Sequence, residues 1–588
     1  MKKENFIIVG ITLIIVTISV SLAYFAAKIV GTPKEINLST KNLYVQFTDN
    51  TAELNTSGIS PGWVYEKTFT IENKSESDYK YNLIIKDLMN TFVTDSLQYK
   101  ITCTSNNGGY SMNEFESMPK SEMAKDTILA YSVSISSGVK QVYKLELRYI
   151  DSDEQNSDMG KKFSGKLFIT EGTEAPSLYD KILSDNPTRE TRTDFSTTFT
   201  TTNTGTLYTS TEQIGSDPAK DVYYFAGDAK NNWVKFAKTK ESSCTYKGKE
   251  VVYIDATENY NDRNPENETE CTSTNICYVL YSAGPSALYN AEETEENEGY
   301  LVGLTESECV EAGDTWTTEK AIWSDATKDI YWRIIRTNAD GSIKLLYAGT
   351  SPDTEKAYIG ESAFNTTDND QMYVGYKYGT TGSLENNRLN TNDSTIKTYI
   401  DNWYKNNLTA YTKYLSKDAV YCNDRNLASG QTYSTTSRFD YATYPRIENE
   451  QPTYNCTNMS DAFSVNNTSA KLDYPIGLMT IDELSYAGGE SNTDLTAPYA
   501  WYYTNANGES ITNFAESWSL SPFNWDGSYS LVWYWGDSSH PGYLDFDGVD
   551  SLNAVRPSVS LSSCNLISRG NGSPEKPYEV YTGSGVCE

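Results

Sequence analysis

The residues best suited to bind a ligand lie close together, between Asn524 and Asp550. This segment is rich in tryptophan, tyrosine, serine, glycine and aspartate. Aromatic side chains supply large, rigid contact areas, and the small polar residues between them supply adaptable hydrogen bonds. We therefore predict a recognition surface here, with Trp533 and Trp535 as the better candidates because they alternate along one strand. The candidate ligand-binding residues are Trp525, Tyr529, Trp533, Tyr534, Trp535, His540, Tyr543, Asp545 and Asp547.

Catalytic chemistry has little support in the sequence. His540 is the only histidine, and it lies in a predicted turn before Pro541-Gly542. A Ser/His/Asp triad also needs an activated serine, and no Gly-x-Ser-x-Gly elbow occurs between a strand and a helix. Phosphate loops, HExxH zinc motifs and CxxC redox motifs are absent as well. We predict no catalytic residue and no enzymatic activity.

A second chemical possibility is calcium binding by the carboxylates of residues 545–550 (DFDGVD). Calcium takes about six to eight oxygen ligands, and this run lacks the spaced bidentate glutamate of an EF-hand. A tight turn at Asp547-Gly548 explains the same residues more simply. The sequence therefore predicts no metal or other cofactor, with Ca²⁺ as the weaker alternative.

The spacing of the nine cysteines is typical of structural disulfides. None has the spacing of a CxxC metal knuckle, so disulfides formed in an oxidising compartment are the better interpretation. Cys422 is expected to pair with Cys456, and Cys564 with Cys587. Cys244, Cys271, Cys277 and Cys309 supply two further pairs whose connectivity the spacing leaves open, and Cys103 remains over.

An apolar run near the amino terminus predicts a membrane anchor. Residues 6–30 are almost continuously apolar and follow Lys2-Lys3. A helix of that length spans roughly 30 Å of hydrocarbon. The lysines favour a cytoplasmic end at residues 1–5 and export of everything after about residue 30. The alternative is a signal peptide cleaved near Ala27.

The next part of the chain predicts strands. Over residues 35–172, segments such as 43–47 (LYVQF) alternate apolar and polar residues, and Gly-rich and Asn-rich turns separate them. We predict an all-β, Ig-like sandwich. Residues 173–217 follow as a linker, which contains a brief helix over 177–184 and a Thr-rich run over 193–211.

Residues 218–588 predict a second domain of α+β type. A cysteine-bearing acidic insertion covers about residues 237–329, and Asp340-Gly341 joins two apolar runs as a hairpin. Helices are expected from a cap at Asp393 or Ser394 and from a cap at Thr480. Because strands precede and follow these helices, the last strands are expected to pair with the first.

The overall charge excludes one class of ligand. The chain has 588 residues, enough for several domains, and carries 48 Lys and Arg against 79 Asp and Glu, a net charge of −31. Binding to a phosphate backbone needs clustered cations. We therefore expect no nucleic-acid partner. The 46 tyrosines and abundant threonine also favour strands over helices.

Several segments together resemble a known family. They are 331–336 (YWRIIR), 475–489 (PIGLMTIDELSYAGG), 518–522 (WSLSP), 555–557 (VRP) and 570–580 (GNGSPEKPYEV). This set is similar to that of membrane-anchored surface proteins of Gram-positive gut bacteria, a family of uncharacterised activity. The resemblance covers about residues 176–588. It implies a C-terminal C-type-lectin-like domain related to the formylglycine-generating enzymes.

The resemblance bears on function in two ways. Variable proteins of diversity-generating retroelements share the implied fold, and their ligand-binding segment is similar to residues 525–550. Formylglycine-generating activity, in contrast, needs an active-site cysteine pair, whereas the spacing and flanking residues of the cysteines here are typical of structural disulfides. The implied fold class is thus an N-terminal transmembrane helix, an all-β Ig-like sandwich and an α+β C-type-lectin-like domain.

These observations predict a single-pass cell-surface protein of adhesin or receptor type. Its expected partner is a glycan or protein ligand on another surface, besides the membrane that holds its N-terminal helix. The alternative is a structural or fibre protein that assembles through the Ig-like module. Residues 70–75 (TIENKS) resemble part of the Ig-like modules of Gram-positive surface and biofilm-fibre proteins, which implies a spacer, or stalk, or else an assembly module.

Overall fold

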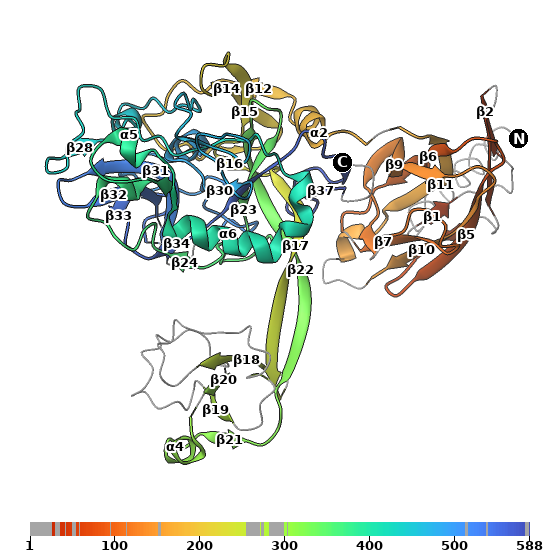
Figure 1. Cartoon of the computed structure of the whole chain (residues 1–588). Helices are drawn as coiled ribbons and strands as arrows, with labels where there is room; N and C mark the ends of the chain where they lie inside the picture. Colours follow the sequence, from red (N-terminus) through yellow and green to blue (C-terminus); the bar gives the residue numbers. More distant parts are fainter. Residues whose placement is uncertain are drawn as a thin grey trace, which may run out of the picture. The chain divides into compact units, whose positions relative to one another are not determined.

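The computed structural model divides into two compact units, Met1–Ala175 and Pro176–Glu588 (Figure 1). It describes residues 26–29, 36–40, 43–49, 54–57, 59–94, 96–112, 115–150, 155–173, 175–247, 249–254, 271, 276–280, 299–302, 304–511, 515–536, 539–581 and 587. Each unit is described by itself below.

The predicted transmembrane helix is corrected where the structure describes it. Ala26–Ile29 forms strand β1, which pairs in parallel with β11 and antiparallel with β4. An apolar run alone does not distinguish a helix from a buried strand, and here pairing decides. Among the described residues, no helix is both long and apolar enough to cross a bilayer. The predicted single-pass localisation is therefore wrong as well; the rest of the predicted span, residues 6–25 and 30, lies outside the described residues.

The first unit is built from two sheets. One contains, in order, β4 (Leu54–Ser57), β1 (Ala26–Ile29), β11 (Lys162–Glu171), β6 (Tyr79–Asn90) and β9 (Ser121–Ile135). The other contains β2 (Ile36–Thr40), β3 (Leu43–Asp49), β5 (Val64–Asn73), β10 (Lys140–Tyr149), β7 (Leu97–Cys103) and β8 (Glu116–Ser117). Alternate side chains of β7 and β10 are buried, as the period of a strand with one covered face requires. The predicted β-rich character is confirmed.

The second unit contains a large mixed sheet and a smaller one. The path of the large sheet is β12 (Thr188–Glu190), β14 (Thr206–Glu212), β15 (Lys220–Tyr224), β22 (Ile322–Thr337), β17 (Trp233–Tyr246), β18 (Lys249–Ile254), β20 (Gly299–Val302), β19 (Ile276–Leu280) and β21 (Thr315–Thr317). Joined to it are β23 (Ile343–Tyr347), β30 (Ile476–Gly477), β35 (Ser558–Leu561), β36 (Ile567–Arg569) and β37 (Tyr578–Val580). The smaller sheet contains β24 (Glu361–Ser362), β34 (Asn553–Ala554), β31 (Ser517–Trp525), β32 (Ser530–Trp535) and β33 (Leu544–Gly548), with β28 (Phe439–Asp440) on β31.

The helices of the second unit are short, so the predicted α+β class is wrong and the unit is mainly β. The α-helices are α2 (Leu178–Asp185), α4 (Glu306–Glu311), α5 (Leu384–Asn387), α6 (Thr395–Asn407), α7 (Thr443–Glu448) and α8 (Ile481–Ala487). The Thr-rich segment expected as part of a linker also contributes strand β14 to the large sheet. Threonine is β-branched and fits a pleated, half-buried surface.

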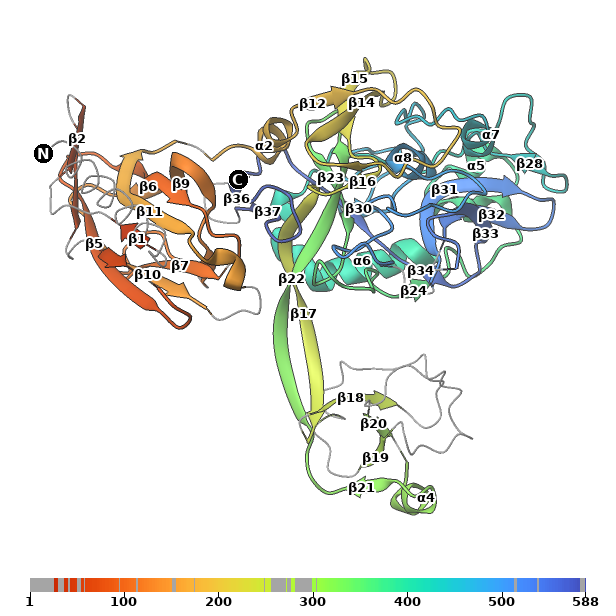
Figure 2. The ribbon, with the colours of Figure 1, turned by 180° about the vertical axis from the view of Figure 1, so that it is seen from behind.

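Strands β17 and β22 extend together as a long ribbon (Figures 1 and 2). Their register runs from Lys238 opposite Asp329 to Thr245 opposite Ile322. Where the ribbon ends, β17 pairs with β18, and a small cluster forms around Cys244, Cys271 and Tyr278. This cysteine-stapled module corresponds to the predicted insertion. Disulfides Cys244–Cys271 and Cys277–Cys309 resolve the pairing that the spacing left open.

The stapled module is expected to depend on its disulfides, because its buried apolar cluster is small. Replacing both Cys277 and Cys309 with serine removes a bridge that spans 32 residues. Local stability should fall by about 3 kcal/mol. Hydrogen exchange of β19 and β21 measures this loss. Replacing Cys564 and Cys587 instead should leave that exchange unchanged, and unaltered protection in the first variant would show that the module is stable without its bridge.

Candidate functional site

The predicted ligand-binding tryptophans lie in the core of the second unit. Trp525, Trp533 and Trp535 are only 2%, 1% and 1% exposed. Trp533 packs edge-on against Phe523 at 4.8 Å between ring centroids, and Trp535 packs against Tyr502 at 5.5 Å. The expectation that these rings face a ligand is corrected. Trp533 and Trp535 alternate on one face of β32, and that face is the covered one, while Trp525 is buried at the end of β31.

The remaining predicted residues are scattered rather than gathered around one cavity. Tyr529 is exposed in a turn, and His540 is exposed with its Nδ1 3.5 Å from Asp494. Tyr543 donates a hydrogen bond to Asn492. Tyr534 and Asp545 do meet, at 3.5 Å between hydroxyl and carboxylate.

The carboxylates around Tyr534 shape its acidity. Burial raises the pKa of the Tyr534 hydroxyl, and the charges of Glu516 and Asp545 raise it further. Burial also raises the pKa of the Asp545 carboxyl, with Asp547 contributing in the same direction. These groups repel added negative charge, and the tyrosine stays a neutral donor at ordinary pH.

A group of three carboxylates suited to a cation lies elsewhere, at Asp393, Asp401 and Asp473. The ammonium of Lys397 already lies among them, 3.3 Å from Asp393, 2.6 Å from Asp401 and 3.2 Å from Asp473. Lys397 is itself fully buried. The place that a cation would take is therefore already filled by an ammonium of the same chain, and we assign no metal to it.

Beside this charged group lies an open groove of about 430 Å³. It is lined by hydroxyl, amide and phenol side chains together with one carboxylate. The lining residues are Ser362, Asn365, Thr366, Thr367, Tyr373, Tyr378, Asp393, Ser394, Thr395, Thr398, Tyr399 and Asn402. No aliphatic side chain is among them. We take this tyrosine groove as the candidate functional site.

The floor of the tyrosine groove is one face of α6. Thr395, Thr398, Tyr399 and Asn402 follow the helical spacing that brings side chains onto a single face. Ser394 caps the helix: its hydroxyl accepts from the amide of Lys397 at 3.2 Å. The opposite face of α6 is buried through Ile396, Ile400 and Tyr404, so the core holds the helix and its exposed side faces the groove.

Both walls of the groove are tied to this floor. On one side, the side-chain nitrogen of Asn365 donates to the backbone carbonyl of Tyr373 at 2.7 Å. The side-chain oxygen of Asn365 accepts from the backbone amide of Thr395 at 3.3 Å. On the other, the short pair β25 (Lys377–Tyr378) and β26 (Asn392–Asp393) carries Tyr378 and Asp393. The groove is thus preformed.

Asp393 is the one ionisable carboxylate of the lining, and two lysines hold it. Its oxygens lie 2.7 Å from Lys377 Nζ and 3.3 Å from Lys397 Nζ. Burial alone would raise the pKa of this carboxyl. The hydrogen bond from Lys377 and the charge of Lys397 outweigh burial, so the pKa is lowered. Asp393 therefore remains an ionised hydrogen-bond acceptor at neutral pH.

The predicted recognition segment supports this groove from behind. The backbone amide of Ser530 donates to the backbone carbonyl of Asp368 at 2.8 Å. The hydroxyl of Ser530 donates to the backbone carbonyl of Asp370 at 2.7 Å. The backbone amide of Asn365 donates to the backbone carbonyl of Val549 at 2.8 Å. The sequence thus identified a supporting element and missed the groove. The available signal was the set of polar side chains on the outer face of the helix predicted from a cap at Asp393 or Ser394, which is α6 in the structure.

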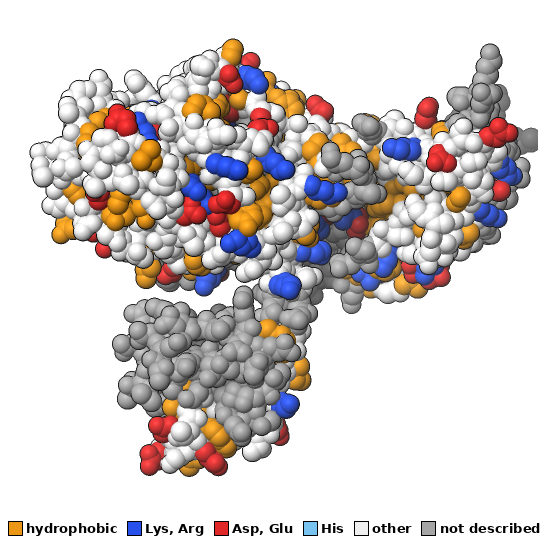
Figure 3. Space-filling view, in the orientation of Figure 1, with side chains coloured by type: hydrophobic (Ala, Val, Ile, Leu, Met, Phe, Trp, Pro, Cys, Tyr) orange, Lys and Arg blue, Asp and Glu red, His pale blue; other side chains and the backbone are white. Residues whose placement is uncertain are grey.

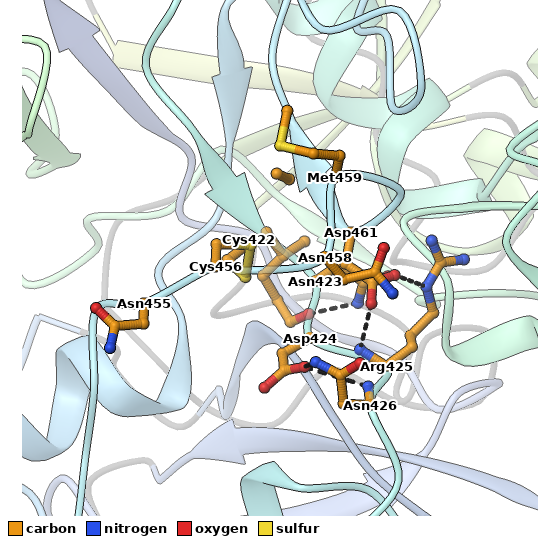
Figure 4. Close-up of a disulfide and its surroundings, with 12 residues drawn as sticks. Cys422, Asn423, Asp424, Arg425, Asn426, Asn455, Cys456, Asn458, Met459 and Asp461 are labelled. Carbon is orange, nitrogen blue, oxygen red and sulfur yellow. Dashed lines mark hydrogen bonds and ion pairs between the residues drawn. A yellow bond between two sulfur atoms is a disulfide. The ribbon is translucent and has the colours of Figure 1, made fainter. Parts of the chain in front are cut away.

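The disulfide Cys422–Cys456 lies in a densely bonded polar region (Figure 4). Asn423 donates to the carbonyl of Leu520 at 2.8 Å, and Arg425 pairs with Asp461 at 2.7 Å. A neighbouring cavity of about 20 Å³ is lined by Glu212, Arg336, Lys344 and Glu483 among others. That volume suits about one water molecule. Arg336 and Lys344 in this lining are paired with Glu212 and Glu483.

Comparison with known proteins adds little to this geometry. No family model matches the chain, and no curated protein sequence matches it. One solved structure, described as "AvmM Catalyzes Macrocyclization in Alchivemycin A Biosynthesis", shares 11% sequence identity and has a TM-score of 0.12. The match covers 25% of this chain and 98% of that chain. So low a TM-score supports no conclusion about fold or function, and the resemblance to Gram-positive surface proteins stays a prediction.

Proposed function

We propose that this chain is an extracellular ligand-binding protein of adhesin or receptor type, with the tyrosine groove as its binding site. The observation that carries the proposal is the groove itself: an open, preformed cavity of about 430 Å³ lined by directional polar groups and three tyrosines. Small-molecule sites commonly have volumes of about 300–1,000 Å³. Its partner is a glycan or a protein ligand.

Extracellular placement is supported by the cysteines. Four disulfides join Cys244 to Cys271, Cys277 to Cys309, Cys422 to Cys456 and Cys564 to Cys587. The disulfide prediction is thereby confirmed. Disulfides persist in oxidising compartments outside the cytosol. A protein exposed to the outside is also in the right place to meet a ligand on another surface.

Recognition fits the groove better than catalysis. Its hydroxyl and amide side chains are neutral, and the Asp393 carboxylate is held ionised by two lysines. A general base works best when its pKa lies near the operating pH. The lowered pKa of Asp393 makes it a weak base, whereas an ionised carboxylate accepts strong hydrogen bonds from ligand hydroxyl groups.

The fibre alternative has no comparable support. Strand β9 lies at one edge of the first unit, where another chain could add a strand. Its pairing with β6 shifts register four times, and Glu122, Lys125 and Asp126 are exposed along it. Irregular pairing and charged side chains are the usual protection of an edge against association.

Filling the groove should weaken ligand binding. In the full chain, Asn402→Trp places a large ring on the groove face of α6, where Asn402 is exposed. Binding to mucin-coated surfaces and to bacterial cells should fall by about 10-fold or more, the equivalent of 1.4 kcal/mol.

The matched control is Asn507→Trp, because Asn507 is an exposed asparagine of the same unit, in the turn after Asn505, and does not line the groove. Circular dichroism should show both variants folded like the parent chain. Equal binding by the two variants would place the binding site outside the groove.

A further inference from the structure

Resting on the proposed function, we infer that the tyrosine groove takes the neutral terminus of a glycan. The chemistry of its lining carries the inference. Four threonines, two asparagines and two serines offer hydroxyl and amide groups, and no leucine, isoleucine, valine or methionine lines it. A ligand bound there gains mainly directed hydrogen bonds, which suits a molecule covered with hydroxyl groups.

The three tyrosines supply the apolar contact that a sugar ring needs. Tyr373 and Tyr378 lie edge to face, with ring centroids 5.3 Å apart and planes at 69°. Both rings are half-buried, as is Tyr399 on the floor. Two rings fixed at such an angle present one face and one edge. The electron-rich face of an aromatic ring attracts the polarised C–H groups of a sugar face.

Hydrogen-bond partners surround this aromatic corner. Thr366, Thr367, Thr398 and Asn402 are exposed within the lining. An amide offers a donor and an acceptor on one planar group, and a carboxylate offers two acceptors. Asn402 and Asp393 can therefore each engage neighbouring hydroxyl groups of a sugar.

Charge decides between neutral and acidic glycans. Asp393 is the only ionised group of the lining, and the lysines that hold it are less accessible: Lys397 is fully buried and Lys377 half-buried. The face of the second unit in Figure 3 is mostly uncharged, with acidic and basic side chains in small groups. Asp401 and Asp473 lie beside Asp393, so three carboxylates face the two lysines here, and a carboxylate on the ligand would meet this excess of negative charge.

A peptide fits the lining less well. Peptide grooves read side chains through apolar pockets or through clusters of arginine, and those that bind proline-rich segments pack apolar proline rings on aromatic side chains. The lining has neither an aliphatic pocket nor an arginine. Its volume of about 430 Å³ also suits a short terminus rather than a long chain.

The test is a glycan array with the full chain. Its probes are neutral oligosaccharides ending in galactose, N-acetylglucosamine, mannose or glucose, and the same oligosaccharides capped with sialic acid. We expect binding to neutral termini, a loss of about 10-fold or more in Asn402→Trp and Tyr378→Ala, and no loss in Asn507→Trp. Sialic acid should weaken binding by a similar factor.

A selectivity readout separates recognition from mere folding. Asp393→Asn removes the repelling charge, so the ratio of sialylated to neutral binding should rise in this variant, which a purely structural role of Asp393 would not produce. Preference for sialylated glycans in the parent chain would overturn the inference. Groove-dependent binding of mucin polypeptide or cell-surface protein, with no neutral glycan bound, would overturn it and leave the proposed function standing. Binding indifferent to Asn402→Trp would overturn both.

Discussion

Glu483→Gln is expected to destabilise the second unit by about 3–5 kcal/mol, the range for breaking one side of a buried ion pair. The Glu483 carboxylate is 1% exposed and lies 2.8 Å from both Arg336 and Lys344. A second acid, Glu212, lies 2.8 Å from Arg336. Neutralising Glu483 leaves Lys344 buried without its counter-charge. Denaturant unfolding followed by tryptophan fluorescence measures the loss.

The chain contains its own control for this substitution. Glu308 occupies the same position in the capping box of α4 that Glu483 occupies in α8, with Thr305 and Thr480 as the caps. Glutamine can still accept the capping hydrogen bond, so Glu308→Gln removes an exposed charge only. Its effect on global unfolding should be small. A small effect of Glu483→Gln as well would mean that the buried ions contribute little.

Acid should weaken the same network. Although burial would raise the pKa of the Glu483 carboxyl, the charges of Lys344 and Arg336 lower it. A carboxyl group whose pKa is lower in the folded chain than in the unfolded chain stabilises the fold at any pH above its unfolded-state pKa. This stabilisation is lost as the pH falls through the lowered, folded-state pKa. Stability should therefore decrease below about pH 4.5, and less steeply in Glu483→Gln.

Trp533→Ala is expected to cost about 3–5 kcal/mol of stability, the range for truncating a buried aromatic side chain. Trp533 is 1% exposed and lies on Phe523. A loss of ligand binding in this variant would accompany unfolding. Thermal and chemical unfolding should show the defect before any ligand is added.

The control is Tyr529→Ala, which truncates an aromatic residue of the same segment that is 52% exposed. Surface substitutions usually change stability by about 0.5 kcal/mol or less. A Trp533→Ala chain that unfolds like the parent, yet fails to bind, would return Trp533 to the recognition surface.

The predictions that rested on local sequence signals were confirmed. The helix predicted from a cap at Asp393 or Ser394 is α6, with Ser394 as its cap, and the one predicted from Thr480 is α8. Both rest on short-range capping chemistry and apolar spacing. The Asp340-Gly341 turn joins β22 to β23, and the closing strand β35 returns to β23. Two disulfides, Cys422–Cys456 and Cys564–Cys587, also matched the predicted pairs.

The wrong predictions depended on contacts between residues that are far apart in the sequence. Alternation in residues 530–535 shows that Trp533 and Trp535 share a face of a strand, but only the packing of Phe523 and Tyr502 shows that this face is covered. Likewise, Ala26–Ile29 reads as part of an apolar helix until β11 is found as its partner. The groove joins residues from Ser362 to Asn402 through turns and side-chain hydrogen bonds, and no motif marks it.

Hydrogen exchange of the full chain, with and without a bound ligand, tests the tyrosine groove most directly. Neutral mucin oligosaccharides and intact mucin serve as the ligands. Slower exchange at residues 362–378 and 392–402, with little change in β31, β32 and β33, is the result that the groove predicts. Binding accompanied by protection around Tyr529, His540 and Tyr543, with the groove unchanged, would contradict it.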